Sequence, residues 1–170
     1  MNKIYLIGFM GAGKTTIGQK LSEILKLSFI DVDQYIEKKY ETDIPTIFKT
    51  YGEERFREYE MISLKELTKY AIVATGGGIV ERKENIQLMK KGVTIYLYAS
   101  LSEIKKRLKH ETNRPLWNQT QKEVENLYER RHKMYEKCAD IIVNTNGKSV
   151  NRVTERVKNI LLHKYPKIEA

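Results

Sequence analysis

The 170-residue sequence contains a single cysteine, Cys138, so the chain cannot form an internal disulfide. A lone thiol is typical of proteins in a reducing cytoplasm. Long hydrophobic runs are also missing, because nothing approaches the roughly 20 apolar residues that cross a bilayer. The apolar stretch within residues Lys3–Ile7 is too short for the core of a signal peptide. We therefore expect a cytoplasmic protein with no membrane partner.

Internal repeats, low-complexity tracts and Gly/Ser-rich linkers are absent, which predicts a single domain over residues 1–170. Positive charge is in excess, with a formal net charge of +9, but it forms no uninterrupted block. Near the C-terminus Glu129 and Glu136 alternate with Arg130, Arg131 and Lys137, a pattern typical of solvated helix faces. We therefore expect no nucleic-acid partner, although a basic nucleic-acid-binding module stays open as an alternative. We also expect a monomer, an expectation that does not follow from the charge pattern.

Short apolar runs alternate with segments of helical periodicity, the pattern of βα units around a parallel sheet. Five strands with helices on both faces would make an open three-layer α/β/α sandwich. The predicted strands are Lys3–Ile7, Ser28–Asp31, Ala71–Thr75, Val93–Tyr98 and Asp140–Asn144. The predicted helices are 14–25, 33–40, 46–50, 52–69, 81–90, 101–109, 120–137 and 149–163. Ser100 and Glu103 have capping-box spacing at the start of the sixth of these helices.

The segment Gly8–Thr15 fits the phosphate-loop pattern G-x-x-x-x-G-K-[ST] at every fixed position, directly after a predicted strand and before a helix. Its glycines let successive backbone amides surround a phosphate, and the helix N-terminus adds partial positive charge. Lys14 would reach the β- and γ-phosphates, and the Thr15 hydroxyl would be a Mg²⁺ ligand. The predicted nucleotide-binding residues here are Gly11, Ala12, Gly13, Lys14, Thr15 and Thr16.

Other motifs follow at the predicted strand ends and on the helices. Taken alone, Asp33 could be a helix cap and Arg57 with Glu60 an ordinary surface ion pair, whereas a triple glycine at a strand end exposes amides to a ligand. The motifs are Asp31-Val32-Asp33, Phe56-Arg57-Glu58-Tyr59-Glu60, Gly76-Gly77-Gly78, Arg114-Pro115-Leu116, and Arg131 with Tyr135 and Ala139-Asp140. Together, in this order from residue 3 to about 145, they resemble the shikimate kinases, P-loop enzymes with a nucleoside-monophosphate-kinase-like fold.

The resemblance implies an ATP-dependent kinase that phosphorylates the 3-hydroxyl of shikimate in chorismate biosynthesis, with Mg²⁺ as cofactor. Asp33 would bind and orient the hydroxyls and could take the proton of the attacking one. Arg57 and Arg131 would clamp the carboxylate, a task that suits the guanidinium fork. The Gly77 amide would contact the substrate, and Glu60 would hold Arg57.

The resemblance also places further groups around the nucleotide. Asp31 would hold Mg²⁺ through water, Arg107 would contact the nucleotide, and Arg114 would close over the phosphates beside Lys14. It implies a substrate-binding segment at about 32–60 and a lid at about 111–119. Excluding water at the phosphates is what such a lid accomplishes.

Three alternatives stay open at the level of sequence. The nearest is another kinase of the same fold, such as one for gluconate or a nucleoside monophosphate. The others are a non-catalytic nucleotide switch and the basic module named above. A GTPase is disfavoured because no guanine-specifying N-K-x-D element is present. The third strand lacks a Walker B aspartate, an absence that the shikimate kinases share.

Overall fold

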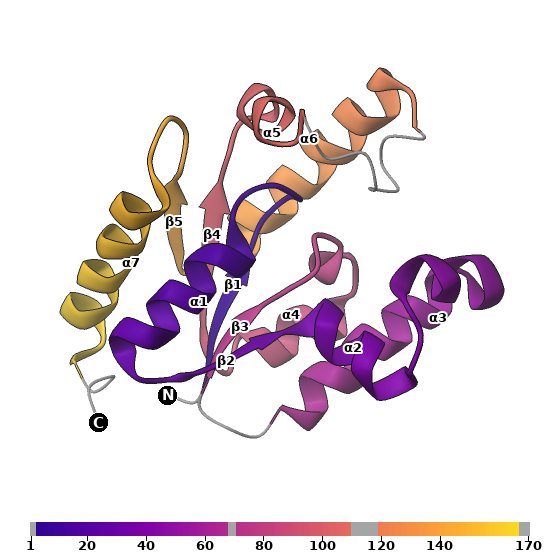
Figure 1. Ribbon diagram of the computed structural model, residues 1–170, viewed down its shortest axis with the longest axis horizontal. Helices are drawn as coiled ribbons and strands as arrows, with labels where there is room; N and C mark the ends of the chain where they lie inside the picture. The colour runs from indigo at the N-terminus through magenta and orange to yellow at the C-terminus, as the bar shows by residue number, and fades with distance from the viewer. Residues whose placement is uncertain (1–2, 68–70, 110–118, 167–170) are drawn as a thin grey trace.

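The computed structural model describes residues 3–67, 71–109 and 119–166. Its centre is a five-stranded sheet of parallel neighbours in the order β2-β3-β1-β4-β5 (Figure 1). The predicted five-stranded parallel sheet is therefore confirmed. The strands are β1 (Lys3–Ile7), β2 (Ser28–Asp31), β3 (Ala71–Ala74), β4 (Val93–Tyr98) and β5 (Ile141–Asn144).

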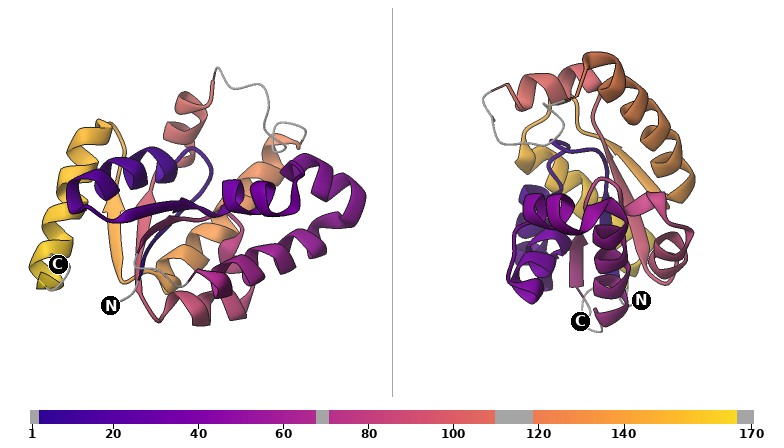
Figure 2. Two further views of the ribbon diagram at one scale, coloured as in Figure 1. Left: turned by 60° about the horizontal axis from the view of Figure 1, so that its bottom comes forward. Right: turned by 90° about the vertical axis from the view of Figure 1, so that its right-hand side faces the viewer.

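Helices cover both faces of this sheet, which confirms the three-layer sandwich (Figures 1 and 2). The helices are α1 (Lys14–Leu25), α2 (Val32–Tyr40), α3 (Ile44–Glu66), α4 (Lys83–Met89), α5 (Leu101–Arg107), α6 (Gln121–Cys138) and α7 (Val150–Lys164), with a short 3₁₀ helix η1 (Ile79–Glu81). Helices α1 and α7 pack together on one face, α4 and α6 lie on the other, and α2 and α3 extend beyond β2. Among the described helices, none has the length and apolar character of a membrane span.

The central strands β1 and β3 place the two glycine-rich loops side by side. Both strands are almost wholly buried, which matches their continuous apolar sequences and is typical of parallel strands covered on both faces. Leu6 of β1 is paired with Ala74 of β3. Just beyond, the Thr75 backbone amide and hydroxyl both donate to the Leu6 carbonyl, at 3.1 and 3.0 Å. The loops after β1 and β3 therefore leave the same edge of the sheet, where open α/β sheets bind ligands.

Two predicted helices, 46–50 and 52–69, form one longer element, α3, with a break inside it. Gly52 has φ 81° and ψ 169°, outside the helical region, so the chain changes direction next to the predicted boundary. The element starts earlier than predicted because Asp43 accepts a hydrogen bond of 2.7 Å from the Thr46 amide and caps it. It also ends earlier, because Leu67 already has extended dihedral angles.

The helix predicted from residue 81 begins at Lys83, and a 3₁₀ turn comes before it. The amides of Ile79 and Glu81 donate to the carbonyls of Gly76 and Gly78, at 3.2 and 3.0 Å, and these i to i+3 bonds make the tighter helix. Arg82 is extended and separates this turn from α4. The glycine loop thus dictates local structure that periodicity alone did not show.

The predicted capping box at Ser100 is only half formed. The Ser100 hydroxyl accepts a hydrogen bond from the Glu103 amide at 3.2 Å, as expected. The Glu103 carboxylate, however, binds Arg107 at 3.0 Å, and the Ser100 amide donates to Asn146 instead. A reciprocal capping box is found at Thr120 and Glu123, at the start of α6. The competing partner Arg107, four residues after Glu103, explains the difference.

Candidate active site

The phosphate loop has the backbone that its glycines predict. Gly13, the residue before α1, has φ 94°, a left-handed conformation that residues with a Cβ rarely adopt. Lys14 begins α1, so the loop leads directly into a helix N-terminus, where free amides and the helix dipole favour an anion. The Lys14 ammonium donates to the carbonyls of Gly8 and Phe9, at 2.8 and 3.0 Å. The positive charge therefore lies within the curve of the loop.

Thr15 and Asp31 meet at the edge of the sheet, although they are far apart in the sequence. The Thr15 hydroxyl donates to Asp31 Oδ2 at 2.8 Å. The other oxygen, Oδ1, accepts from the amides of Asp33 and Gln34 at 3.0 and 3.2 Å, so Asp31 caps α2. The sequence offered Asp33 as a possible cap, and the structure assigns that role to Asp31. A hydroxyl and a carboxylate side by side are the hard oxygen donors that suit Mg²⁺.

Arg107 joins the phosphate loop to the turn after β5. Its Nη1 contacts the carbonyls of Gly11 and Ala12, at 3.3 and 3.5 Å, and its Nη2 donates to the Thr145 carbonyl at 2.8 Å. Glu103 holds the Nε atom of the same guanidinium. The side chain thus lies behind the loop residues that are predicted to bind nucleotide.

Two carboxyl groups converge on Gly76 from different helices. A Cβ on Gly76 would lie 2.8 Å from Glu60 Oε1 and 3.0 Å from Asp33 Oδ1. Both oxygens are buried and lack a hydrogen-bond partner within the described parts of the chain. Burial and the nearby Asp31 raise the pKa of Asp33 to about 6, against the opposing effect of Lys14 and Arg57. This region can therefore accept hydrogen bonds and a proton from a ligand.

Arg57 is buried and held by two glutamates. Its Nη1 donates to Glu60 Oε2 at 2.6 Å, the contact that their spacing in the sequence predicts. Its Nη2 and Nε donate to Glu53 Oε1, at 2.9 and 3.2 Å. Burial raises the pKa of the Glu60 carboxyl, and the guanidinium opposes that rise. The ion pair of Arg57 and Glu60 is a buried one, so the surface ion pair considered for the sequence is excluded.

Arg131 reaches the same glycine loop from α6. Its Nε donates to Glu81 Oε1 at 2.9 Å, and a Cβ on Gly77 would lie 3.5 Å from its Nη1. Arg130 also binds Glu81, through two hydrogen bonds of 2.8 and 2.9 Å. Although burial opposes it, the two arginines hold the pKa of Glu81 below its ordinary value. The structure therefore brings Arg131, Arg57 and Asp33 together at the glycine loop.

Some predicted residues are placed less directly. Arg114 and most of the predicted lid lie outside the described residues. Thr16 lies in the first turn of α1 and is exposed. The contacts that the sequence did not predict include those of Glu53 with Arg57 and of Glu81 with Arg131. The four-residue spacing of Glu53 and Arg57 on a helix could have revealed the first. Nothing in the sequence indicates the second, because it joins elements far apart in the chain.

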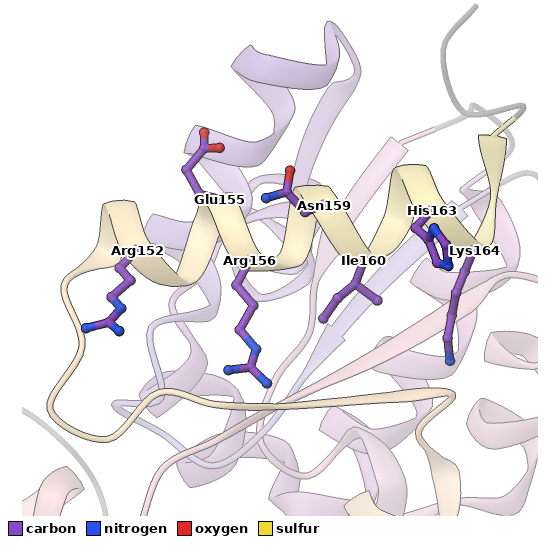
Figure 3. Close-up of a pocket in the computed structure, with 7 residues that line it drawn as sticks. All are labelled: Arg152, Glu155, Arg156, Asn159, Ile160, His163 and Lys164. Atoms are coloured by element: carbon purple, nitrogen blue, oxygen red, sulfur yellow. The ribbon is translucent and has the colours of Figure 1, made fainter.

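A shallow surface pocket of about 630 Å³ lies away from these residues, along α7. Figure 3 shows Arg152, Arg156 and Lys164 on one side of the helix and Glu155 and Asn159 on the other. No residue predicted from the sequence for the site lines it. The chemistry is therefore assigned to the carboxyl edge of the sheet, and the α7 pocket is a separate surface feature.

The fold and the site together define the class of enzyme to which the protein belongs. A phosphate loop, a hydroxyl–carboxylate pair and a neighbouring cluster of one aspartate and two arginines are the parts of a P-loop kinase that acts on an anionic acceptor.

Comparison with known proteins narrows this class. The family model described as shikimate kinase matches residues 10–162. A shikimate kinase of Bacillus cereus is 44% identical over 163 residues, which cover 93% of this chain and 97% of that protein. The chain belongs to the shikimate kinase family.

Solved structures of the family have the same fold. The shikimate kinase from Acinetobacter baumannii in complex with shikimate has a TM-score of 0.91 at 34% identity, covering 97% of this chain and 95% of that one. The shikimate kinase from Aquifex aeolicus has a TM-score of 0.85 at 36% identity, covering 95% and 97%.

Proposed function

We propose that the chain transfers the γ-phosphoryl group of ATP to the 3-hydroxyl of shikimate, a step in chorismate biosynthesis. Family membership supports this activity, and so does the structure solved for the Acinetobacter baumannii relative with shikimate. The observation that carries the proposal is the placement of Asp33, Arg57 and Arg131 around one glycine loop, next to the phosphate loop. One carboxylate and two guanidinium groups match an acceptor with hydroxyls and a carboxylate.

The nucleotide side of the proposal rests on the phosphate loop. Its amides and Lys14 would bind the β- and γ-phosphates, with Gly11, Ala12, Gly13, Thr15 and Thr16 around them. Thr15 and Asp31, whose oxygens lie 2.8 Å apart, would hold Mg²⁺, Asp31 through a water molecule. When bound there, Mg²⁺ would neutralise negative charge on the phosphates during transfer. Arg107 would support the nucleotide site by holding the carbonyls of Gly11 and Ala12 in the phosphate loop.

Charged side chains would orient the acceptor at its carboxylate and at its attacking hydroxyl. Arg57, held by Glu60, and Arg131 would bind the carboxylate, and the Gly77 amide would contribute a further hydrogen bond. Asp33 would accept a hydrogen bond from the attacking hydroxyl. With its pKa raised to about 6, it is a stronger base than an ordinary aspartate and still largely ionised at neutral pH. Positioning of this kind is the main requirement of phosphoryl transfer.

Several broader features belong to the same proposal. Residues 32–60, which include α2 and the first part of α3, would bind the acceptor, and residues 111–119 with Arg114 would form a lid over the phosphates. We further propose that the protein is a cytoplasmic monomer with no nucleic-acid or membrane partner. Sedimentation of the purified protein would test whether it is a monomer. Its retention on immobilised DNA or RNA at low salt would test whether it binds nucleic acid.

The decisive experiment is a coupled assay of ADP release from Mg-ATP, with and without shikimate. Gluconate and AMP serve as parallel acceptors, and omission of Mg²⁺ serves as a control. The proposal requires a rate that depends on shikimate, that disappears in Asp33→Asn, and that needs a much higher shikimate concentration in Arg57→Lys. Turnover of gluconate or AMP without turnover of shikimate would make it a sibling kinase. ATP binding with no acceptor at all would make it a nucleotide switch.

A further inference from the structure

Helix α6 binds the glycine loop at two points. Tyr135, fully buried, donates a hydrogen bond from its hydroxyl to the Gly77 carbonyl. Arg131, one helical turn earlier, donates from Nε to Glu81, which lies in η1 just after the loop. The two contacts hold both ends of a five-residue segment, 77–81, against a single helix face.

The contact of Tyr135 completes the hydrogen bonding of the three glycine carbonyls. The Gly76 carbonyl accepts from Ile79, the Gly78 carbonyl accepts from Glu81, and the Gly77 carbonyl accepts from Tyr135. In a trans peptide the carbonyl and the following amide point in opposite directions. Fixing the Gly77 oxygen therefore also fixes the Gly78 N–H, which points away from Tyr135. Because glycine has no side chain to restrict rotation, this hydroxyl is an effective restraint on that peptide plane.

We propose that Tyr135 positions the glycine loop and that Glu81 positions Arg131. The loop and Arg131 together would then form the part of the site that binds the carboxylate of the acceptor. The inference rests on the proposed function and assigns a role to two residues that are not among those predicted to bind shikimate or the nucleotide. Tyr135 sets the orientation of the peptide between Gly77 and Gly78, and with it the Gly78 amide. Glu81 takes the Nε edge of Arg131 and leaves the Nη1 end beside Gly77. A group that is oriented before the ligand arrives binds it without a further ordering cost.

The alternative is that Tyr135 only fills the core. Its ring packs against Tyr96, with centroids 5.0 Å apart, and Tyr135→Phe keeps that packing while removing the hydroxyl. Helix α6 also offers a matched control. Tyr128 lies two turns earlier, is buried, and donates its hydroxyl to the Ala99 carbonyl at 2.8 Å, away from the glycine loop. Tyr128→Phe removes the same chemical group from the same helix.

The test measures stability and kinetics of the wild type, Tyr135→Phe, Tyr128→Phe and Glu81→Gln. We expect both tyrosine variants to lose similar thermal stability. Of the two tyrosine variants, only Tyr135→Phe should raise the KM for shikimate, by about three- to tenfold, the equivalent of one hydrogen bond. Its KM for ATP should stay within twofold of the wild type, and kcat should change less than KM. Glu81→Gln should also raise the KM for shikimate, because Arg131 loses its charged anchor.

The outcomes separate this inference from the proposed function. If the wild type does not use shikimate, the proposed function fails, and this inference fails with it. If the wild type uses shikimate but Tyr135→Phe and Tyr128→Phe differ in stability alone, Tyr135 is a packing residue and the inference is wrong. Should Tyr135→Phe fail to fold, Glu81→Gln decides: an unchanged KM for shikimate overturns the proposal, and a raised one supports it.

Discussion

The guanidinium of Arg57 lies against Gly78 so closely that a Cβ on this glycine would be 2.3 Å from both Nη atoms. No side chain can therefore occupy position 78 while Arg57 keeps its ion pair with Glu60. The neighbouring Gly77 differs, because a Cβ there would meet its nearest atoms at 3.5 Å, which is ordinary contact. The third glycine of the motif is thus required by the arginine behind it.

This relationship predicts different outcomes for two adjacent substitutions. Gly78→Ala should lower the free energy of unfolding by about 1–3 kcal/mol, as overpacking does in well-packed interiors. Gly77→Ala should change it much less. Urea denaturation of both variants would check this. Equal losses would mean that the loop backbone, and not the position of Arg57, limits residue choice at both positions.

The two carboxylate oxygens of Asp31 have separate roles, because Oδ1 caps α2 and Oδ2 faces Thr15. The substitution Asp31→Asn can distinguish these roles. An asparagine can still cap α2 through Oδ1, so the free energy of unfolding should change little. The charge facing Thr15 is lost, and we expect the Mg²⁺ concentration for half-maximal activity to rise at least tenfold. Asp43→Asn is the matched control, because Asp43 caps α3 and has no contact with the phosphate loop. Identical Mg²⁺ dependence in the two variants would exclude Asp31 from the metal site.

The raised pKa of Asp33 predicts a gain in stability when its charge is removed. The folded protein holds this proton up to about pH 6, whereas the unfolded chain releases it near 3.8, so stability falls as the pH rises between these values. In buffer without Mg²⁺ and nucleotide, Asp33→Asn should raise the free energy of unfolding by up to about 3 kcal/mol at pH 7.5.

The same gain should shrink as the pH falls from 6 towards 4, because Asp33 is then neutral in the wild type too. Denaturation curves at several pH values would show this, and activity should be lost at every pH. A gain that does not depend on pH would mean that ionisation of Asp33 is not its cause.

Glu53 competes for the arginine that we assign to the substrate carboxylate. Its side chain is 62% exposed, yet it binds the Nε and Nη2 atoms of Arg57. Glu53→Gln should therefore lower the KM for shikimate, by about two- to fivefold, because exposed ion pairs are weak. Glu54→Gln removes the same charge from the next residue, which pairs with Arg82 instead, and should have no effect. A raised KM in Glu53→Gln would show that Glu53 orients Arg57 for binding.

Much of the fold, the phosphate loop and the pairing of Arg57 with Glu60 could be predicted because their determinants are local. The phosphate loop needs glycines, a lysine and a threonine within eight residues, and a strand before it, all of which the sequence shows directly. The buried strands β1, β3 and β4 were located because buried parallel strands are largely apolar runs. The pair of Arg57 and Glu60 followed from helical spacing. The boundaries that were wrong, at α3 and at η1, lie where a glycine or a loop hydrogen bond overrides periodicity.

The sequence by itself determined the nucleotide-binding loop, the succession of strands and helices along the chain, and the motifs that the chain shares with one family. Each of these depends on residues that are close to one another in the chain. Tertiary structure decided which of these residues meet. It paired Thr15 with Asp31, set Arg131 on Glu81, placed Tyr135 under Gly77 and gave the helix cap to Asp31 instead of Asp33. These contacts depend on how strands and helices are arranged in space, and spacing along a single chain does not encode that arrangement in any local pattern.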